Sequence, residues 1–337
     1  MIQSKHEYLY ILDAIDSNMN GDPGNKNRPR WDYRTKRLTP SDTSLKRTIR
    51  DTWHNYENQD ILIRKEVNDE GDVVTMEKLI ARDDRIENPH LYDKNGKRNN
   101  KGKKKEREIQ DRDFSQKIVS KYIDSRVFGL VAALKEEKAF NFTGPGQFLF
   151  GRSLHEVEVK ENKGTLVAQV IEGKKQGTFN TLYTVPYALV QYYGSINPVN
   201  AKKTGMTKGD LNALDKSLWL GSNALSSRAK GGLKSRFLMR ICYKDPLVSL
   251  GDLREYVEIE SEKEDLSLRS IKDITLKLSM LCQRIISEKE NIQTVYLKEG
   301  DLIKTDIDIR KELNDTGIMV KNFEFDRGYE IKANDYQ

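Results

Sequence analysis

The chain has 337 residues, of which 36% are hydrophobic and 33% are charged, and its formal net charge is +6. This composition predicts a folded core with a very polar exterior, arranged as one large domain or two. The two cysteines are too few for a disulfide framework or a thiolate metal cluster. No apolar run approaches the roughly 18 residues of a membrane span, and no signal peptide is recognisable, so a soluble cytoplasmic protein is expected.

The positive charge lies in the first three quarters of the chain. Residues 244–337 hold 15 Lys and Arg against 21 Asp and Glu, so residues 1–243 hold the other 43 against 31, a net charge of +12. A surface that binds a polyanion is therefore expected within residues 1–243.

A basic helix is predicted to follow an apolar strand near the N-terminus, across a long loop rich in Asn, Gly and Pro. Residues 8–15 are apolar on both faces, which is typical of a central strand covered on both sides. Ser41 or Asp42 can cap the helix that follows. The cations of this region are Lys26, Arg28 and Arg30 in the loop and Lys46, Arg47 and Arg50 on the helix.

These cations suit a phosphate backbone, which requires positive charge fixed on a rigid element. Three cations on one helix are by themselves more typical of a solvated surface face. The neighbouring loop cations and the basic stretches further along the chain favour a nucleic-acid site.

Residues 58–112 are charged and poor in aromatic side chains, and they are predicted to form an insertion. Between Lys94 and Arg107 the segment holds eight Lys and Arg against one Glu. Such a run is typical of a mobile loop, which can bind a polyanion by counterion release without prior order. A helix is expected to resume near Asp113.

Gly144, Pro145 and Gly146 are expected to interrupt the secondary structure. The strand predicted after them carries Gln147 and Phe148 and ends near Arg152. Phe148 lies in an apolar run, so burial in the core competes with a role in base stacking. The guanidinium of Arg152 is easily exposed at the strand end, where phosphate contact is expected.

The following residues predict a hairpin and a long strand. Apolar and charged residues alternate within residues 153–172, which predicts a hairpin with its turn at 162–164. Residues 178–194 predict a further strand, in which Pro186 indicates an edge or a bulge.

A second helix is predicted to begin near Thr207 and to end at glycines before a basic turn. The cations beside the strand that follows are Arg228, Lys230, Lys234 and Arg236.

The order of these elements fits an α+β, ferredoxin-like β-α-β-β-α-β core with long insertions, or an RNA-recognition sheet, although the RNA-recognition signature is absent. Beyond Asp245 a helix is predicted over about residues 265–288, followed by a short hairpin at 294–307. No Walker A, H-E-x-x-H or zinc-deaminase motif occurs. No catalytic residue, cofactor or metal ligand is therefore assigned.

Four motifs, in order over residues 7–245, resemble the backbone subunit of type I CRISPR Cascade complexes, the Cas-seven superfamily, and its type I-B branch in particular. The motifs are NGDPGNKNRPRWD with TPSDTSLKRTIR downstream, GPGQFLFGRSLHEVEV, VPYALVQYYGSINPVNAKKTGMTKGDLNALDKSLWLG and SSRAKGGLKSRFLMRICYKD.

The resemblance implies a ferredoxin-like palm with a helical fingers insertion and a β-hairpin thumb. The palm would comprise residues 1–57, 113–152 and 178–245, the fingers 58–112 and the thumb 153–177, with the acidic segment 246–337 packed on the palm.

The resemblance also implies a non-catalytic scaffold in antiviral defence, without a membrane partner. Copies would assemble head to tail along CRISPR RNA, together with other Cascade subunits, and the exposed guide bases would pair with target DNA. The residues carried over by motif as RNA-facing are Lys46, Arg47, Arg50, Gln147, Phe148, Arg152, Arg228 and Lys230.

Two other functions stay open. Type III relatives cut target RNA with a loop aspartate and a metal, so Asp22 in the loop could serve a metal-dependent RNA endonuclease. A stand-alone RNA-binding regulator would instead form a discrete monomer or dimer on RNA.

Overall fold

The computed structural model describes residues 1–325, with the exception of residues 69, 77, 81, 83–115, 133–139, 166–178 and 226. The predicted basic run at 94–107, and the predicted insertion from residue 83 on, lie outside the described residues.

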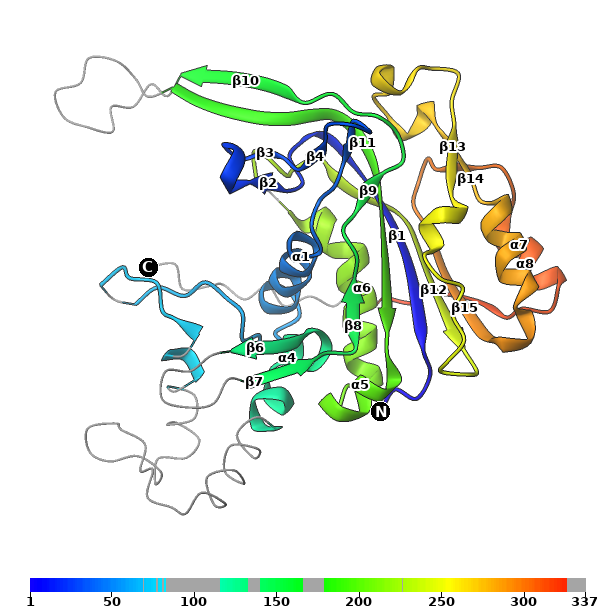
Figure 1. The fold of residues 1–337 in the computed structure, drawn as a ribbon, viewed down its shortest axis with the longest axis horizontal. Coiled ribbons are helices and arrows are strands. Elements are labelled where there is room, and N and C mark those ends of the chain that lie inside the picture. The colour runs from blue at the N-terminus through cyan, green and yellow to red at the C-terminus, as the bar shows by residue number, and fades with distance from the viewer. Residues whose placement is uncertain are drawn as a thin grey trace.

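An eight-stranded sheet forms the centre of the molecule (Figure 1). Neighbouring strands are antiparallel, except for the parallel pair β15 and β17. The strand order is β10 (Lys160–Thr165), β11 (Phe179–Ile196), β1 (His6–Ser17), β12 (Leu233–Tyr243), β15 (Ile292–Glu299) and β17 (Val320–Asn322), and β8 (Gly146–Phe148) and β9 (Arg152–Ser153) also pair with β11.

The central strand is β1, which has neighbours on both sides and is buried on both faces from His6 to Ala14. This confirms the strand predicted over residues 8–15. Its alternate side chains enter two different cores: Tyr8 and Tyr10 pack in one, while Leu9 and Ile11 pack in the other. One strand therefore joins the two layers that cover the sheet.

Helices cover the face to which Tyr8 and Tyr10 point. The two long helices are α1 (Asp42–Asn55) and α6 (Lys208–Ala224), and the short helices are α4 (Ile123–Phe128) and α5 (Pro198–Thr204). Ser41 caps α1 by accepting a bond from the N–H of Ser44, and Thr207 with Asp210 forms a capping box on α6. The element order β1, α1, β8 and β9, β11, α6, β12 is β-α-β-β-α-β, and the predicted α+β class is confirmed.

The acidic C-terminal segment covers the opposite face. Its buried side chains, such as Leu276 and Leu281, pack in the same core as Leu9 and Ile11 of β1. Its elements are η3 (Leu253–Tyr256), β13 (Glu258–Glu260), η4 (Asp265–Ser267), η5 (Ile271–Asp273), β14 (Thr275–Lys277), α7 (Ser279–Ser287), η6 (Lys289–Asn291), β16 (Lys304–Thr305) and α8 (Ile309–Asp315).

Two predictions for this segment are wrong. The helix predicted over 265–288 is only α7, because the residues before it form short 3₁₀ turns and β14, which pairs with β13 and β16 in a separate sheet. The hairpin predicted at 294–307 does not form, since β15 pairs with β12 and β16 pairs with β14. Short apolar runs do not distinguish a helix from a buried strand.

The ribbon of β10 and β11 differs from the predicted hairpin. Asn162–Gly164, the expected turn, lies inside β10 and pairs with residues 180–182 of β11. The Asn162 side chain donates to Thr184 Oγ1 across the ribbon (3.0 Å). Asn and Gly in sequence are a common signal of a hairpin turn. Here the ribbon continues past these residues and extends away from the sheet (Figure 1).

Pro186 lies where the pairing of β11 with β1 is interrupted. Ser17 pairs with Val185 and Ile15 with Tyr187, but Asp16 between them has a positive φ of 45°. Proline has no N–H to donate to the ladder. The register is the same on both sides of Pro186, so the ladder has a gap there and the bulge given as one alternative does not form.

Smaller elements complete the described chain. The loop before α1 contains β2 (Gly21–Asp22), η1 (Pro23–Asn25), β3 (Arg28–Pro29), β4 (Trp31–Asp32) and β5 (Arg37–Leu38), and β6 (Gly129–Ala132) pairs with β7 (Phe140–Thr143). The helix predicted near Asp113 includes residues 116–121, and Ile118 and Tyr122 pack with Leu62 in a small third core.

We expect Leu281→Ala to lower the free energy of unfolding by about 2–5 kcal/mol, because it opens a cavity beneath the sheet. Leu281 is fully buried, whereas the adjacent Met280 is 51% exposed. Met280→Ala is the matched control, with an expected change within about 0.5 kcal/mol. Urea unfolding measures both, and equal losses would show that the C-terminal segment does not share the core.

Candidate nucleic-acid interface

The loop before α1 is fastened to the start of that helix. The Asn20 side-chain oxygen accepts from the N–H and the hydroxyl of Ser41, both at 2.8 Å. Ser44 Oγ donates to the carbonyl of Met19 (3.1 Å). These bonds fix the loop cations relative to the helix.

The turn between α6 and β12 lies against the end of β1 and the start of the same loop. Asn18 N–H donates to the carbonyl of Ala229 (2.6 Å), and Gly232 N–H donates to Ser17 Oγ (3.2 Å). A Cβ at Gly232 would lie 2.0 Å from the carbonyl oxygen of Ile15, so only glycine permits this approach. The second basic stretch is thereby brought beside the first.

The segment that joins β8 to β9 is the third segment that lies beside the start of α1. Gly151 N–H donates to the carbonyl of Pro40 (2.7 Å), and Leu38 N–H donates to Ser153 Oγ (3.1 Å). A Cβ at Gly151 would lie 2.9 Å from Pro40 and 2.8 Å from the ring of Tyr192. Three basic motifs, distant in sequence, therefore meet around the N-terminal half of α1.

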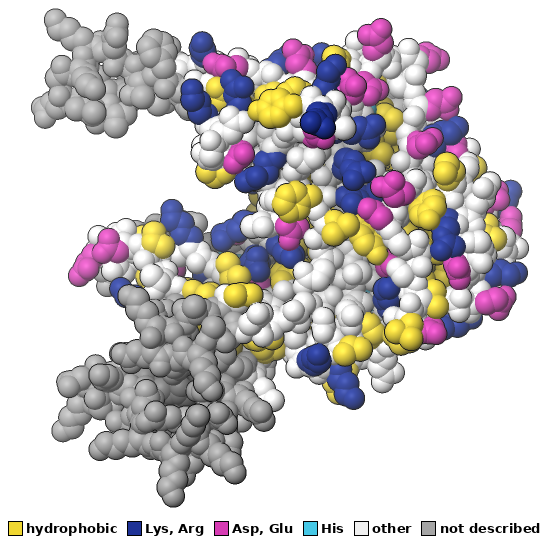
Figure 2. Space-filling view, in the orientation of Figure 1, with side chains coloured by type: hydrophobic (Ala, Val, Ile, Leu, Met, Phe, Trp, Pro, Cys, Tyr) yellow, Lys and Arg dark blue, Asp and Glu magenta, His cyan; other side chains and the backbone are white. Residues whose placement is uncertain are grey.

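Seven of the predicted site residues present exposed or partly exposed cations here. Figure 2 shows Lys and Arg side chains on the walls of the recess beneath the β10–β11 ribbon. We call this set the basic site; it consists of Lys26, Arg28, Arg30, Arg47, Arg152, Arg228 and Lys230. Lys234 is exposed but lies opposite Asp13 in the sheet, on the face turned away from α1, so it is not included.

Four of these cations are paired with carboxylates at the surface. The pairs are Arg28 with Glu161 (3.6 Å), Arg30 with Asp22 (3.4 Å), Arg47 with Asp51 (2.6 Å) and Arg152 with Glu255 (3.3 Å). Among the residues that the structure describes, none forms an ion pair with Lys26 or Arg228.

Lys230 connects the turn with α1. Partial burial lowers the pKa of its ammonium, while the nearby Asp51 carboxylate raises it and the Arg47 guanidinium lowers it. Lys230 and Arg47 therefore lie close enough to interact, and a phosphate between them would be attracted by both.

Lys46 and Gln147 are less available. Lys46 Nζ pairs with Asp42 (2.9 Å), lies 5.5 Å from the centre of the Phe128 ring, and its side chain is only 14% exposed. Gln147 is exposed and donates to the carbonyl of Gly144 (3.0 Å).

Three predicted site residues are buried. Arg50, 7% exposed, pairs with Asp124 (2.9 Å), whose carboxylate also accepts from the N–H groups of Leu62 and Ile63. Arg236, 4% exposed, pairs with Asp13 of β1 (2.7 Å). These two guanidinium groups hold the core together and present no charge to a ligand, so we do not include them in the basic site.

Phe148 is the third buried residue. Its ring lies 6.0 Å from that of Tyr8 and fills the space above Gly194, where a Cβ would meet it at 2.4 Å. Of the two roles considered from the sequence, burial in the core and base stacking, the structure shows burial in the core.

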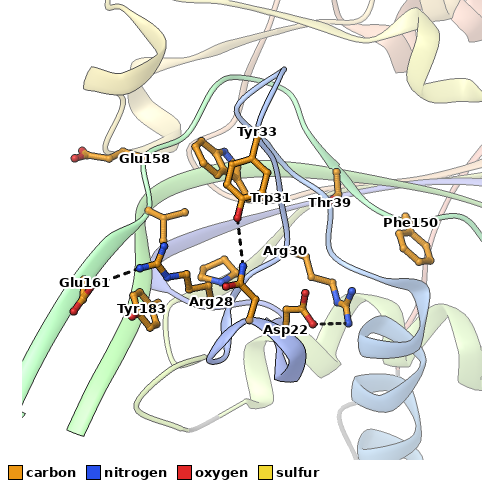
Figure 3. A pocket seen from close by; sticks show the side chains of 13 residues that line it. Asp22, Arg28, Arg30, Trp31, Tyr33, Thr39, Phe150, Glu158, Glu161 and Tyr183 are labelled. Carbon is orange, nitrogen blue, oxygen red and sulfur yellow. Dashed lines mark hydrogen bonds and ion pairs between the residues drawn. The ribbon is translucent and has the colours of Figure 1, made fainter. Parts of the chain in front are cut away.

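A pocket of about 450 Å³ lies between the loop and the root of the β10–β11 ribbon (Figure 3). The Arg28 guanidinium lies 4.6 Å from the centre of the Tyr183 ring, and Trp31 and Tyr33 contact edge to face at 5.1 Å. Phe150, which also lines the pocket, is 54% exposed.

Two buried N–H groups, on Arg30 Nε and Trp31 Nε1, have no hydrogen-bond partner among the described residues. Aromatic faces, cations and free donors together suit an unstacked nucleobase. Sequence reasoning missed Trp31, Tyr33, Phe150 and Tyr183 as site residues; the aromatics beside Arg28 and Arg30 in the loop were the available signal.

Asp22, the candidate aspartate of the endonuclease alternative, is engaged within the loop. It caps η1 by accepting from the N–H of Gly24 (3.2 Å) and pairs with Arg30. Both contacts are typical structural uses of aspartate in a turn.

Comparisons with known proteins identify the family. The family model described as CRISPR-associated protein Cas7 matches residues 4–279, and the chain belongs to that family. CRISPR-associated protein Cas7 of Haloferax volcanii is 28% identical over 324 residues, which cover 90% of this chain and 89% of that protein.

Chains of two solved structures were also matched. A chain of a CRISPR RNA-guided surveillance complex in a pre-nicking state has a TM-score of 0.48 and 14% identity, covering 93% of this chain and 99% of its own. A chain of a second CRISPR RNA-guided surveillance complex has a TM-score of 0.46 and 11% identity, covering 93% and 98%.

Family membership confirms the resemblance found in the sequence. The protein is a non-catalytic, CRISPR RNA-binding backbone subunit of the type I surveillance complex, in which it functions with other subunits in antiviral defence. Within the described part of the chain, no helix has the length and apolar character needed to cross a membrane.

We expect Arg50→Ala to destabilise the fold by about 3 kcal/mol, because it leaves the buried Asp124 carboxylate without its counter-ion. Arg47→Ala, one turn away in an exposed pair, should change stability by less than about 1 kcal/mol. Urea unfolding of the two variants measures the difference. If Arg50→Ala kept full stability and lost RNA affinity, Arg50 would belong in the basic site after all.

Proposed function

We propose that the basic site holds the phosphate backbone of CRISPR RNA, and that copies of the chain assemble head to tail along it. The observation that carries the proposal is the convergence of three separate basic motifs around α1 in a Cas7 protein. Cations on a rigid helix and two fastened loops contact phosphates without reading sequence. Such a protein follows the shape of any guide.

The parts of the fold take the roles that the family resemblance implies. The sheet with α1 and α6 is the palm, and the charged insertion at 58–112 is the fingers. The β10–β11 ribbon is the thumb, which displaces a guide base. The remaining bases pair with target DNA, so sequence specificity comes from base pairing and not from this chain. The protein then belongs to a type I-B complex.

The aromatic pocket at the root of the ribbon takes an unstacked base. Its lining by loop cations and by the aromatic side chains of Trp31, Tyr33 and Phe150 supports this role. A base there can stack on a ring face while its phosphates reach the loop cations. Trp31 and Arg30 supply N–H donors for the base edge.

We expect the triple variant R47A/R152A/R228A to bind RNA more weakly, whatever its sequence. The slope of log K against log salt should fall by about 2, at roughly 0.7 for each lost single-strand phosphate contact. Arg50 is left unchanged, because its loss would alter folding. The matched control is K272A/K289A/K311A, which removes three exposed lysines of the C-terminal segment. An unchanged slope in R47A/R152A/R228A would remove these residues from the interface.

Native mass spectrometry tests the assembly. With CRISPR RNAs of increasing length, bound copies should rise stepwise, and the RNA should stay whole in magnesium. One or two copies at every length would identify a stand-alone RNA-binding protein. Cleavage of a complementary RNA at regular intervals, abolished by Asp22→Ala, would contradict the non-catalytic role.

A further inference from the structure

A second pocket, of about 600 Å³, lies beside the first residues of the chain, at the start of β1. Its walls come from residues 1–6, the start of α6, and the strands β12, β15 and β17. The lining includes Lys208, Arg240 and Lys321, and no Asp or Glu is among the described residues that form it. We call it the N-terminal pocket.

Buried nitrogen atoms in this pocket have no partner. His6 is 5% exposed and Arg240 is 4% exposed, yet His6 Nδ1 and Arg240 Nε make no hydrogen bond to the described residues. The other side of the Arg240 guanidinium is well supported, by Asp215 at 3.2 Å and by the Tyr296 ring at 4.1 Å. Buried polar groups are rarely left unpaired, so the free N–H of Arg240 indicates an acceptor supplied from outside. Burial lowers the pKa of His6 to about 3, so its imidazole is neutral and adds no charge.

Exposed carboxylates that form no ion pair lie in the C-terminal segment. Glu258, Glu262 and Glu264 are exposed, and none forms an ion pair with another described residue. We call these three residues the acidic strip. Figure 2 shows Asp and Glu side chains gathered along the upper right edge, where Figure 1 places this segment.

The acidic strip lies far along the sheet from the N-terminal pocket. Neighbouring residues of the strip contact the root of the ribbon: Glu255 pairs with Arg152, and Asp265 accepts from the N–H of Glu156. The pocket instead surrounds His6, the first residue of β1. The two features also belong to opposite covering layers of the sheet.

A head-to-tail array requires this kind of separation. Its contacts are heterologous, so every copy must carry both a patch and the complement of that patch at a different place. The described lining of the pocket is cationic and holds no carboxylate, and the strip holds three carboxylates without an ion pair to a described residue. The lysines beside the strip, Lys263 and Lys277, are already paired with Asp273 and Glu260. The two features therefore satisfy the requirement through charge.

We propose that the acidic strip of one copy docks in the N-terminal pocket of the next copy, where its carboxylates meet Lys208, Lys321 and the free N–H of Arg240. The inference rests on the proposed head-to-tail assembly and adds a contact between proteins to the shared RNA. That contact orients successive copies, since charge complementarity fixes register.

Charge reversal tests the contact in the full-length chain on CRISPR RNAs of increasing length, by native mass spectrometry. K208E/K321E should bind a short RNA with unchanged affinity, because neither residue belongs to the basic site. On longer RNAs it should add a second copy roughly tenfold more weakly, because like charges then face each other. K289E/K311E makes the same change in charge at two exposed lysines outside both patches and should assemble as the unaltered protein does.

A mixing experiment makes the test specific. E258K/E262K/E264K should also fail to add copies by itself, whereas an equal mixture with K208E/K321E should assemble, because every junction in an alternating array is complementary. Normal assembly of K208E/K321E alone, or failure of the mixture, would overturn the inference. The inference would also be overturned if the isolated K208E/K321E chain were less stable and yet assembled normally. That result would mean that a segment of the same chain occupies the pocket. If the unaltered protein adds no copies with RNA length, the proposed function itself fails.

Discussion

The fold depends on a single strand that is buried on both sides. β1 contributes Tyr8 and Tyr10 to the core beneath α1 and α6, and Leu9 and Ile11 to the core beneath the C-terminal segment. Because the side chains of a strand alternate, a shift of one residue would exchange the two sets and disturb both layers at once. Two polar residues of β1, Asp13 and Glu7, are also fully buried. Asp13 Oδ2 pairs with Arg236, and the Glu7 carboxylate accepts from two tyrosine hydroxyls.

Local signals explain how much of this could be predicted. Apolar runs and periodicity predict β1, α1 and α6, and a cap at Ser41 or Asp42 predicts the start of α1. These signals depend only on neighbours in sequence. The order of the elements and the family motifs then gave the α+β class and the function. The resemblance implies that the basic motifs lie together on the RNA-facing surface. It does not give the contacts that hold them beside α1.

Long-range pairing explains most of what was missed. Arg50 and Arg236 have the spacing of surface cations, and only partners distant in sequence, Asp124 and Asp13, keep them inside. The aromatic pocket is likewise formed by a loop and a strand more than a hundred residues apart. The turn signal at Asn162–Gly164 failed because an isolated ribbon places little restriction on its residues.

The basic site is partly neutralised before any ligand arrives. Exposed ion pairs contribute little to stability, so a phosphate can replace a carboxylate on Arg28, Arg47 or Arg152 at small cost. The same pairs reduce the attraction of the unoccupied surface for unrelated polyanions. Strong binding then requires several phosphates in a row, which a continuous RNA strand offers and small anions do not.

The course of β11 has a mechanical consequence. This strand of 18 residues pairs with β1 as far as Val185 and with β10 from Thr184 outward, so it changes neighbours beside Pro186, opposite the left-handed Asp16. The ladder lacks one pair where the ribbon leaves the sheet. A tilt of the ribbon at this point would keep the pairs that join β11 to β1 from Ile196 to Tyr187, so the ribbon could follow a bent strand while the sheet kept its shape.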